Sequence, residues 1–242
     1  EYTALVEQLQ GQVLYLAPDS QSYLNPMDLD LSTDVGESPM LMQADFLLSQ
    51  CELMMASYGN PLMPIEKSLI DRCISLVYRD YLKRPTPENM PILGDLYQCL
   101  RAQDNHTADD LATAMEIYVT GSLSYLNHRT NVDLNNRLVC YNTSKMGQGL
   151  KKLVMANVQK HIWQRTTINR YAGVTTRIFP DEFHMLLKEP QTAAYTAEIY
   201  KRFRKWNGIP TSLTQNVKDL LASPEIENIL ENSDFILMLN QG

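Results

Sequence analysis

The sequence predicts an α/β fold with a mainly parallel sheet and an all-α insertion. Short apolar runs typical of buried strands occur near both ends of the chain, and in its second half they alternate with helical stretches. Strands that alternate with helices pair in parallel through right-handed crossovers, and helices then cover the sheet. Between the two sets of strands, apolar residues recur only at helical spacing.

Residues 1–36 are expected to start the α/β core. Residues 2–9 fit the end of a helix, and the apolar run 13–17 predicts a buried strand. The stretch 18–38 is rich in Pro, Asp, Ser and Asn, which favours a loop. Residues 37–120 then form the predicted all-α insertion, with several helices and no strand.

Residues 121–242 are expected to complete the core. A long helix is predicted over 147–170, with apolar residues on one face and basic residues, among them Lys160, on the other. A second helix is predicted over 192–206. Strand-like runs occupy 123–126, 138–141, the residues before Asp181, 209–215 and 235–239.

The composition describes an acidic chain that can bury a full core. It has 242 residues, of which 44% are hydrophobic, and a net charge of -7. This balance argues against a surface built throughout for nucleic acid. The widely spaced cysteines favour a reducing compartment, and the unclustered histidines lack the ligand spacing of a zinc site. No apolar run reaches about 18 residues, so no transmembrane segment is predicted.

Asp181 and Glu182 are the strongest functional signal in the sequence. Ligands of a parallel sheet bind beyond the carboxyl ends of its strands, where these acids and Gln215 are expected to lie. In a phosphate-hydrolysing site, Asp181 would hold magnesium through water and Glu182 would position or deprotonate the attacking water. Gln215 would contact the terminal phosphate or that water. The alternative for Asp181 and Glu182 is an acid pair in a solvated turn that precedes a helix. The alternative for Gln215 is a polar loop residue without a catalytic role.

Basic residues gather in two further places. A basic run from Lys201 to Lys205 ends the second predicted helix, where cations complement the helix dipole. The alternative is an arginine finger, with Arg204 the first choice, that reaches a nucleotide in a neighbouring subunit. The basic face of 147–170 can meet DNA, acidic partners or solvent. Solvent is favoured because no series of stacking aromatic residues accompanies this face.

A phosphate-binding loop is absent from the sequence. Such a loop needs Gly-x4-Gly-Lys-Ser/Thr, because the glycines let backbone N–H groups close around phosphates while the lysine reaches the terminal ones. The chain has no such motif. No residue of this chain is therefore predicted to bind phosphates through such a loop.

Several separated segments resemble one family. They are 177–187, 202–211 and 214–216, with further support from 15–18 with 23–28, 65–67 with 70–73, and 121–123 with 127–131. Together they resemble the ATPase domain of VirB/TraC/TrbE-type conjugation motors, the type IV secretion ATPases, in the form found on Gram-positive mobile elements. Pro180 departs from the family, which usually has an aliphatic residue there.

The resemblance implies a RecA-like P-loop NTPase core that uses ATP and magnesium. Because the Walker A loop of this family is missing, no cofactor-binding residue is predicted in this chain, and we expect the chain alone to bind ATP poorly and to turn it over little or not at all. It implies that Asp181 and Glu182 are the Walker B acids, that Gln215 is the strand-end glutamine, and that Arg204 is the arginine before it. The expected function is a motor ATPase that couples ATP hydrolysis to substrate translocation or pilus assembly. The alternative is a non-catalytic assembly or docking module, since the chain has no phosphate-binding loop.

The resemblance also implies partners and a location. The full-length protein is expected to form a homo-oligomer, a hexamer, and to work with other secretion-system ATPases and inner-membrane channel components. Direct contact with DNA is left open. The expected location is the cytoplasm, at the inner face of the cell membrane.

Overall fold

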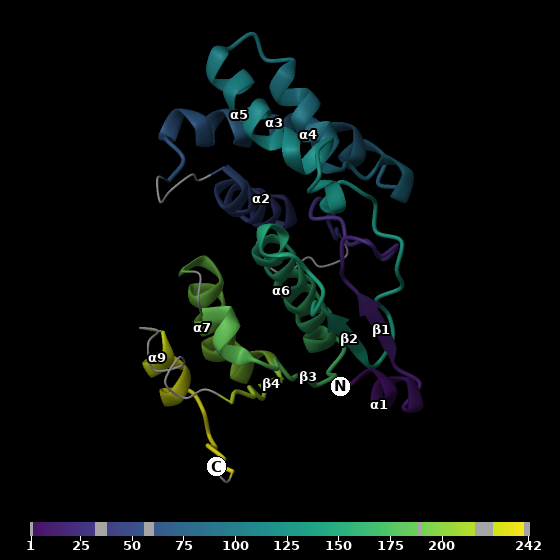
Figure 1. Ribbon diagram of the computed structural model, residues 1–242, viewed down its shortest axis with the longest axis vertical. Coiled ribbons are helices and arrows are strands. Elements are labelled where there is room, and N and C mark those ends of the chain that lie inside the picture. Colours follow the sequence, from purple (N-terminus) through teal and green to yellow (C-terminus); the bar gives the residue numbers. More distant parts are fainter. Residues whose placement is uncertain (1, 32–37, 56–60, 188–189, 216–224, 240–242) are drawn as a thin grey trace. The chain divides into compact units, whose positions relative to one another are not determined.

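The computed structural model describes residues 2–31, 38–55, 61–187, 190–215 and 225–239. The chain divides into two compact units, Glu1–Val158 and Gln159–Gly242. Each unit contains one two-stranded parallel sheet among its described residues (Figure 1). The helix α6 (Gln148–Tyr171) begins in the first unit and continues in the second. In the described ranges, no helix is both long and apolar enough to cross a bilayer.

The sheet of the first unit joins residues that are far apart in the sequence. After α1 (Thr3–Gln8), β1 (Gln12–Tyr15) pairs in parallel with β2 (Val139–Asn142). The first residues of the two strands lie opposite each other, and so do the last. The structure therefore has strands where the sequence predicts them, at 13–17 and 138–141, each displaced by one or two residues.

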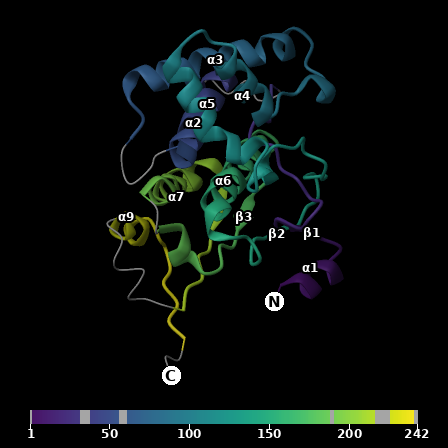
Figure 2. The ribbon, with the colours of Figure 1, turned by 45° about the horizontal axis from the view of Figure 1, so that its top comes forward.

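Helices fill the segment between these two strands. In its described part the segment has four α-helices and two short 3-10 helices, which are α2 (Pro39–Met55), α3 (Pro64–Lys83), η1 (Pro87–Asn89), α4 (Leu93–Arg101), α5 (His106–Val119) and η2 (Ser124–Leu126). The helices α3, α4 and α5 lie side by side in both views (Figures 1 and 2). Fully buried side chains such as Ile70, Tyr78 and Leu96 form their core. The domain limits 1–36, 37–120 and 121–242 stay a prediction.

The loop after β1 is packed rather than solvated. Asn25 is fully buried, and its N–H donates to Thr130 Oγ1 at 2.8 Å. Tyr23 N–H donates to Asn131 Oδ1, also at 2.8 Å. Two of the segments that carry the family resemblance therefore hold each other in place, although about a hundred residues separate them in the sequence.

The second unit follows the order helix, strand, helix, strand. After α6 come β3 (Thr176–Ile178), η3 (Phe183–Leu187), α7 (Pro190–Phe203), η4 (Arg204–Trp206), β4 (Gly208–Pro210) and α9 (Ile226–Glu231). The strands β3 and β4 pair in parallel, with Thr176 opposite Gly208. α9 packs on α7, as Figure 1 shows. This is the strand, helix, strand order that parallel pairing requires.

Two of the predicted strands are wrong, and a third, predicted over 209–215, is shortened to β4, Gly208–Pro210. Within 123–126 the structure has the 3-10 helix η2, in which the consecutive side chains of Tyr125 and Leu126 are both buried. A short apolar run does not distinguish a strand from a buried helical turn. Residues 235–239 form no strand, and their side chains are 60% to 90% exposed. A strand needs a hydrogen-bonded neighbour, and none of the described strands pairs with them.

One residue of the predicted basic face of α6 is buried. Lys160 is only 8% exposed, and Asn157, Gln159 and His161 are buried as well. Gln159 Nε2 donates to Thr196 Oγ1 of α7 at 3.0 Å. An amphipathic pattern does not reveal burial of a charged residue such as Lys160.

Candidate functional site

Backbone pairing in the second unit continues beyond β3 and β4. Leu213 donates its N–H to the carbonyl of Pro180 and accepts the N–H of Phe183 at its own carbonyl, both at 2.9 Å. Asp181 and Glu182 lie between these two anchoring points in the sequence. The acid pair therefore lies beside the segment that follows β4.

The backbone turns sharply at the acid pair. Pro180 has no N–H to donate across the sheet, and β3 ends two residues before it, at Ile178. Glu182 then adopts a left-handed conformation with φ of 49°, and its N–H donates to Asp181 Oδ1 at 3.0 Å. This conformation costs a non-glycine residue roughly 1–2 kcal/mol, and backbone strain of this kind clusters at functional sites.

Side chains connect the acid pair to the neighbouring segment. Glu182 Oε2 lies 3.4 Å from His184 Nδ1. The same nitrogen lies 3.5 Å from the hydroxyl oxygen of Thr214, which belongs to the segment after β4. The His184 side chain is 13% exposed and that of Glu182 is 45% exposed. A contact chain therefore crosses from one strand end to the other, and the Asp181 carboxylate remains exposed beside it.

Gln215 directly follows this contact chain and is exposed. The structure thus places three of the four predicted site residues, Asp181, Glu182 and Gln215, after the carboxyl ends of two paired parallel strands. Ligands of parallel sheets bind at this edge.

Arg204, the fourth predicted residue, lies in η4, and its side chain is outside the described residues. Aromatic contacts fix this short helix. Trp206 packs on Trp163 of α6 with ring centroids 4.6 Å apart, and the Arg170 guanidinium lies 4.6 Å from the centre of the Trp206 ring. Stacking and cation–π contacts of this kind each contribute roughly 0.5–1.5 kcal/mol. They hold the backbone of Arg204 next to α6.

The turn from η4 into β4 depends on Asn207 and Gly208. Asn207 is left-handed, with φ of 56°, and its side-chain oxygen accepts the Thr175 hydroxyl at 3.1 Å. A Cβ atom on Gly208 would lie 2.5 Å from Phe203 Cδ2, so only glycine fits without a shift. This pair sets the start of β4 and thereby the place of the segment that ends in Gln215.

Comparison with known proteins decides the family. The TraG P-loop domain family matches residues 95–242 of the sequence. The chain belongs to this family. Among solved structures, VirB4 of Thermoanaerobacter pseudethanolicus is similar over 100% of this chain and 67% of its own, with a TM-score of 0.79 and 23% sequence identity. No curated protein matches the sequence.

The TraG family and the shared fold confirm two predictions. The resemblance to conjugative-transfer and type IV secretion ATPases is confirmed, and so is the α/β fold of a P-loop NTPase with parallel strands. The structural likeness, at this level of identity, concerns the fold. The roles of Asp181, Glu182, Gln215 and Arg204 stay predictions.

The surroundings of Asp181 fit a magnesium ion held through water. Mg²⁺ keeps several waters and takes one or two carboxylates together with phosphate oxygens. Asp181 is exposed at a strand end, and its Oδ1 already accepts the Glu182 N–H. Within the described part of this TraG domain, no group of three or more His, Cys, Asp or Glu residues could hold a metal ion by itself.

The sequence alone assigns no functional role to His184 or Thr214. The histidines show no metal-ligand spacing, which leaves His184 without a predicted role. The positions of both residues in the sequence, close to predicted site residues, could have drawn attention to them. His184 stands two residues after Glu182, and Thr214 stands directly before Gln215.

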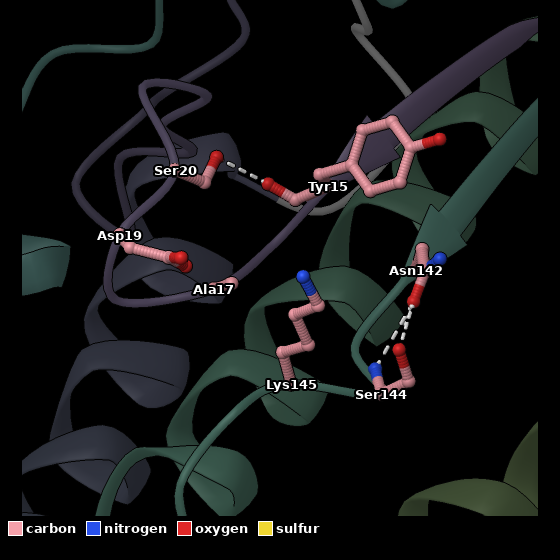
Figure 3. Close-up of a pocket in the computed structure, with 7 residues that line it drawn as sticks. All are labelled: Tyr15, Ala17, Asp19, Ser20, Asn142, Ser144 and Lys145. Carbon is pink, nitrogen blue, oxygen red and sulfur yellow. Dashed lines mark hydrogen bonds between the residues drawn. The ribbon is translucent and has the colours of Figure 1, made fainter.

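A separate pocket lies at the carboxyl ends of β1 and β2 in the first unit (Figure 3). It has a volume of about 230 Å³ and is lined by Tyr15, Ala17, Asp19, Ser20, Asn142, Ser144 and Lys145. The Lys145 side chain extends between the two strand ends in Figure 3. Lys145 and Asp19 bring opposite charges to the pocket, so its lining does not select one class of ligand.

Proposed function

We propose that this TraG domain is the part of a conjugation or type IV secretion motor ATPase that contains the hydrolytic acids. The motor couples ATP hydrolysis to substrate translocation or pilus assembly. One observation carries the proposal: parallel pairing of β3 with β4 brings the acid pair and the segment ending in Gln215 to the same edge of the sheet. The family and the fold favour such a motor over a non-catalytic assembly or docking module.

Each residue has a defined task in this proposal. Glu182 accepts a proton from the attacking water, and Gln215 orients that water or the terminal phosphate. Asp181 holds magnesium through water, and the ion supplies charge neutralisation at the phosphate oxygens when it is bound with ATP. The 3.4 Å contact between Glu182 Oε2 and His184 Nδ1, next to the left-handed turn at Glu182, supports a defined position for this carboxylate.

Arg204 completes the site of a neighbouring subunit in this proposal. An arginine supplied in trans stabilises the charge that develops on the transferred phosphoryl group. Its place in η4, fixed by the stack of Trp206 on Trp163, supports such a role because a finger needs a rigid base. The role implies a homo-oligomer, which we propose to be a hexamer in the full-length protein.

Partners and location follow from the family rather than from the contacts described above. We infer that the motor works at the cytoplasmic face of the membrane with other secretion-system ATPases and channel components. Direct contact with DNA rests on the resemblance, and burial of Lys160 removes one of the basic residues predicted to face outward on α6.

Subunit mixing tests the proposal for Arg204. In the intact motor, Arg204→Ala and Glu182→Gln are each expected to lose ATP turnover. Mixing the two variants restores part of it, because an Arg204→Ala subunit supplies Glu182 at an interface where its neighbour supplies Arg204. Lys205→Ala is the matched control, an exposed cation one residue further on, and it is expected to keep full turnover. Full turnover by Arg204→Ala alone would exclude a finger at this position.

A further inference from the structure

His184 Nδ1 lies between two oxygen atoms that belong to different strand ends. It is 3.4 Å from Glu182 Oε2 and 3.5 Å from Thr214 Oγ1. Both distances exceed the roughly 2.9 Å of a well-formed hydrogen bond of this type. The nitrogen is therefore within reach of both partners and tightly bound to neither.

One ring nitrogen cannot serve both partners in the same way. When Nδ1 carries the proton of a neutral imidazole, it donates to the Glu182 carboxylate. When the proton is on Nε2, the Nδ1 lone pair accepts the Thr214 hydroxyl instead. The two arrangements differ in tautomer and not in net charge. They leave the Glu182 carboxylate held in one case and released in the other.

We propose that His184 is a positioning residue that couples the segment after β4 to the orientation of Glu182. The inference rests on the function proposed above, because it assumes that Glu182 acts on the attacking water. Thr214 directly precedes Gln215, the residue assigned to the terminal phosphate or the water. A shift of this segment on nucleotide binding changes the Thr214 contact, and His184 passes the change to Glu182.

The backbone supports this coupling. Leu213, next to Thr214, makes two backbone hydrogen bonds of 2.9 Å to the residues on either side of the acid pair. A displacement of the segment after β4 therefore pulls on Pro180 and Phe183, the residues on either side of Asp181 and Glu182. The change of partner that the proposal requires takes place at the ring nitrogen His184 Nδ1, which lies near both oxygen atoms.

The competing account is that His184 only fills space in η3. Two substitutions separate the accounts, because both replace the ring by an uncharged amide. In His184→Asn the amide lies near the position of Nδ1, whereas in His184→Gln it lies near Nε2. A packing role makes the two variants alike or favours the larger glutamine. A positioning role through Nδ1 favours asparagine.

Kinetics of the intact motor provide the first measurement. We expect His184→Gln and His184→Leu to lower kcat about ten- to hundredfold, the loss that misplacement of a reacting group by about 1 Å produces. His184→Asn is expected to stay within about threefold of the native kcat. ATP affinity is expected to be unchanged in all three, because His184 acts on Glu182 and not on the nucleotide. Equal kcat values for the Asn and Gln variants would overturn the proposal.

A second measurement does not depend on turnover. Histidine labelled with ¹⁵N in the intact, nucleotide-free motor reports which ring nitrogen carries the proton, and loss of one signal in His184→Leu assigns it. Thr214→Val removes the hydroxyl and is expected to shift the His184 signal toward protonated Nδ1. Thr214→Ser retains the hydroxyl and is expected to keep the native signal. An unchanged signal in Thr214→Val would overturn the proposal.

Glu182→Gln distinguishes failure of this inference from failure of the proposed function. If Glu182→Gln turns over ATP at the native rate, the proposed function of the acid pair is wrong, whatever the His184 variants do. If Glu182→Gln is inactive while His184→Gln matches His184→Asn, only the role of His184 is wrong.

Discussion

The buried imidazole of His161 makes the second unit sensitive to acid. The side chain lies on α6, is 7% exposed, and its Nε2 has no hydrogen-bond partner among the described atoms. Burial, with a smaller contribution from the neighbouring charge of Lys160, lowers the pKa of His161 to about 3. The folded protein therefore holds this imidazole neutral at pH values where the unfolded chain protonates it.

The pKa difference gives the size of the effect. In the unfolded chain the pKa is near 6.5. A group whose pKa is depressed on folding contributes its full stability above the unfolded pKa and loses it as the pH falls toward the folded pKa. At pH 5 the unfolded state binds the proton and the folded state does not. From the unfolded pKa of about 6.5 down to pH 5 is about 1.5 pH units, and at about 1.4 kcal/mol per unit the free energy of unfolding falls by about 2 kcal/mol. The free energy of unfolding is expected to fall by this amount between pH 7.5 and pH 5.

Urea denaturation followed by tryptophan fluorescence measures this loss. Both tryptophans of the chain, Trp163 and Trp206, lie in the second unit, so their emission reports on the unit that contains His161. Carboxylates also titrate in acid, and His161→Leu removes only the imidazole contribution. We expect the variant to lose about 2 kcal/mol less than the native chain between pH 7.5 and pH 5. Equal losses in the two proteins would refute the reasoning.

Three further substitutions test the local structure around the site by the same unfolding measurement. Gly208→Ala is expected to lower the free energy of unfolding by about 2 kcal/mol, because the added Cβ would overlap Phe203; native stability would show that β4 can shift at no cost. Trp206→Ala is expected to cost about 3 kcal/mol through loss of its stack and of the Arg170 contact, and a loss below about 1 kcal/mol would contradict this. Glu182→Gly is expected to raise the free energy of unfolding by up to about 1 kcal/mol, since glycine adopts the left-handed conformation without strain, whereas a decrease would argue against strain at this acid.

The sequence predicts the edge of the second sheet well because its signals are local. The apolar residues before Asp181 and those after Gly208 are short runs separated by one helix, and parallel pairing of such strands follows from general rules of connection. From that pairing, the placement of Asp181, Glu182 and Gln215 after the strand ends also follows. Pro180 shortens β3, as expected for a residue without an N–H to donate.

Other features depend on contacts that a linear pattern does not contain. The role proposed for His184 depends on its contact with Thr214, which lies thirty residues away in the sequence, and on its contact with Glu182, whose backbone is left-handed. Lys160 lies on the face of α6 that the pattern predicts to be solvated, yet it is buried. Residues 235–239 are apolar enough for a strand, but pairing needs a partner in space. Arg204 can be placed in η4, while its side chain lies outside the described residues.

The central claim is that Glu182 acts on the water in ATP hydrolysis, and one comparison in the intact motor tests it directly. Glu182→Gln keeps the shape of the side chain and removes its capacity to accept a proton. Glu227→Gln, at an exposed acid of α9 in the same unit, is the matched control. We expect Glu182→Gln to bind ATP with native affinity and to lose turnover at least about a hundredfold, while the control behaves as the native motor. Native turnover in Glu182→Gln would contradict the account.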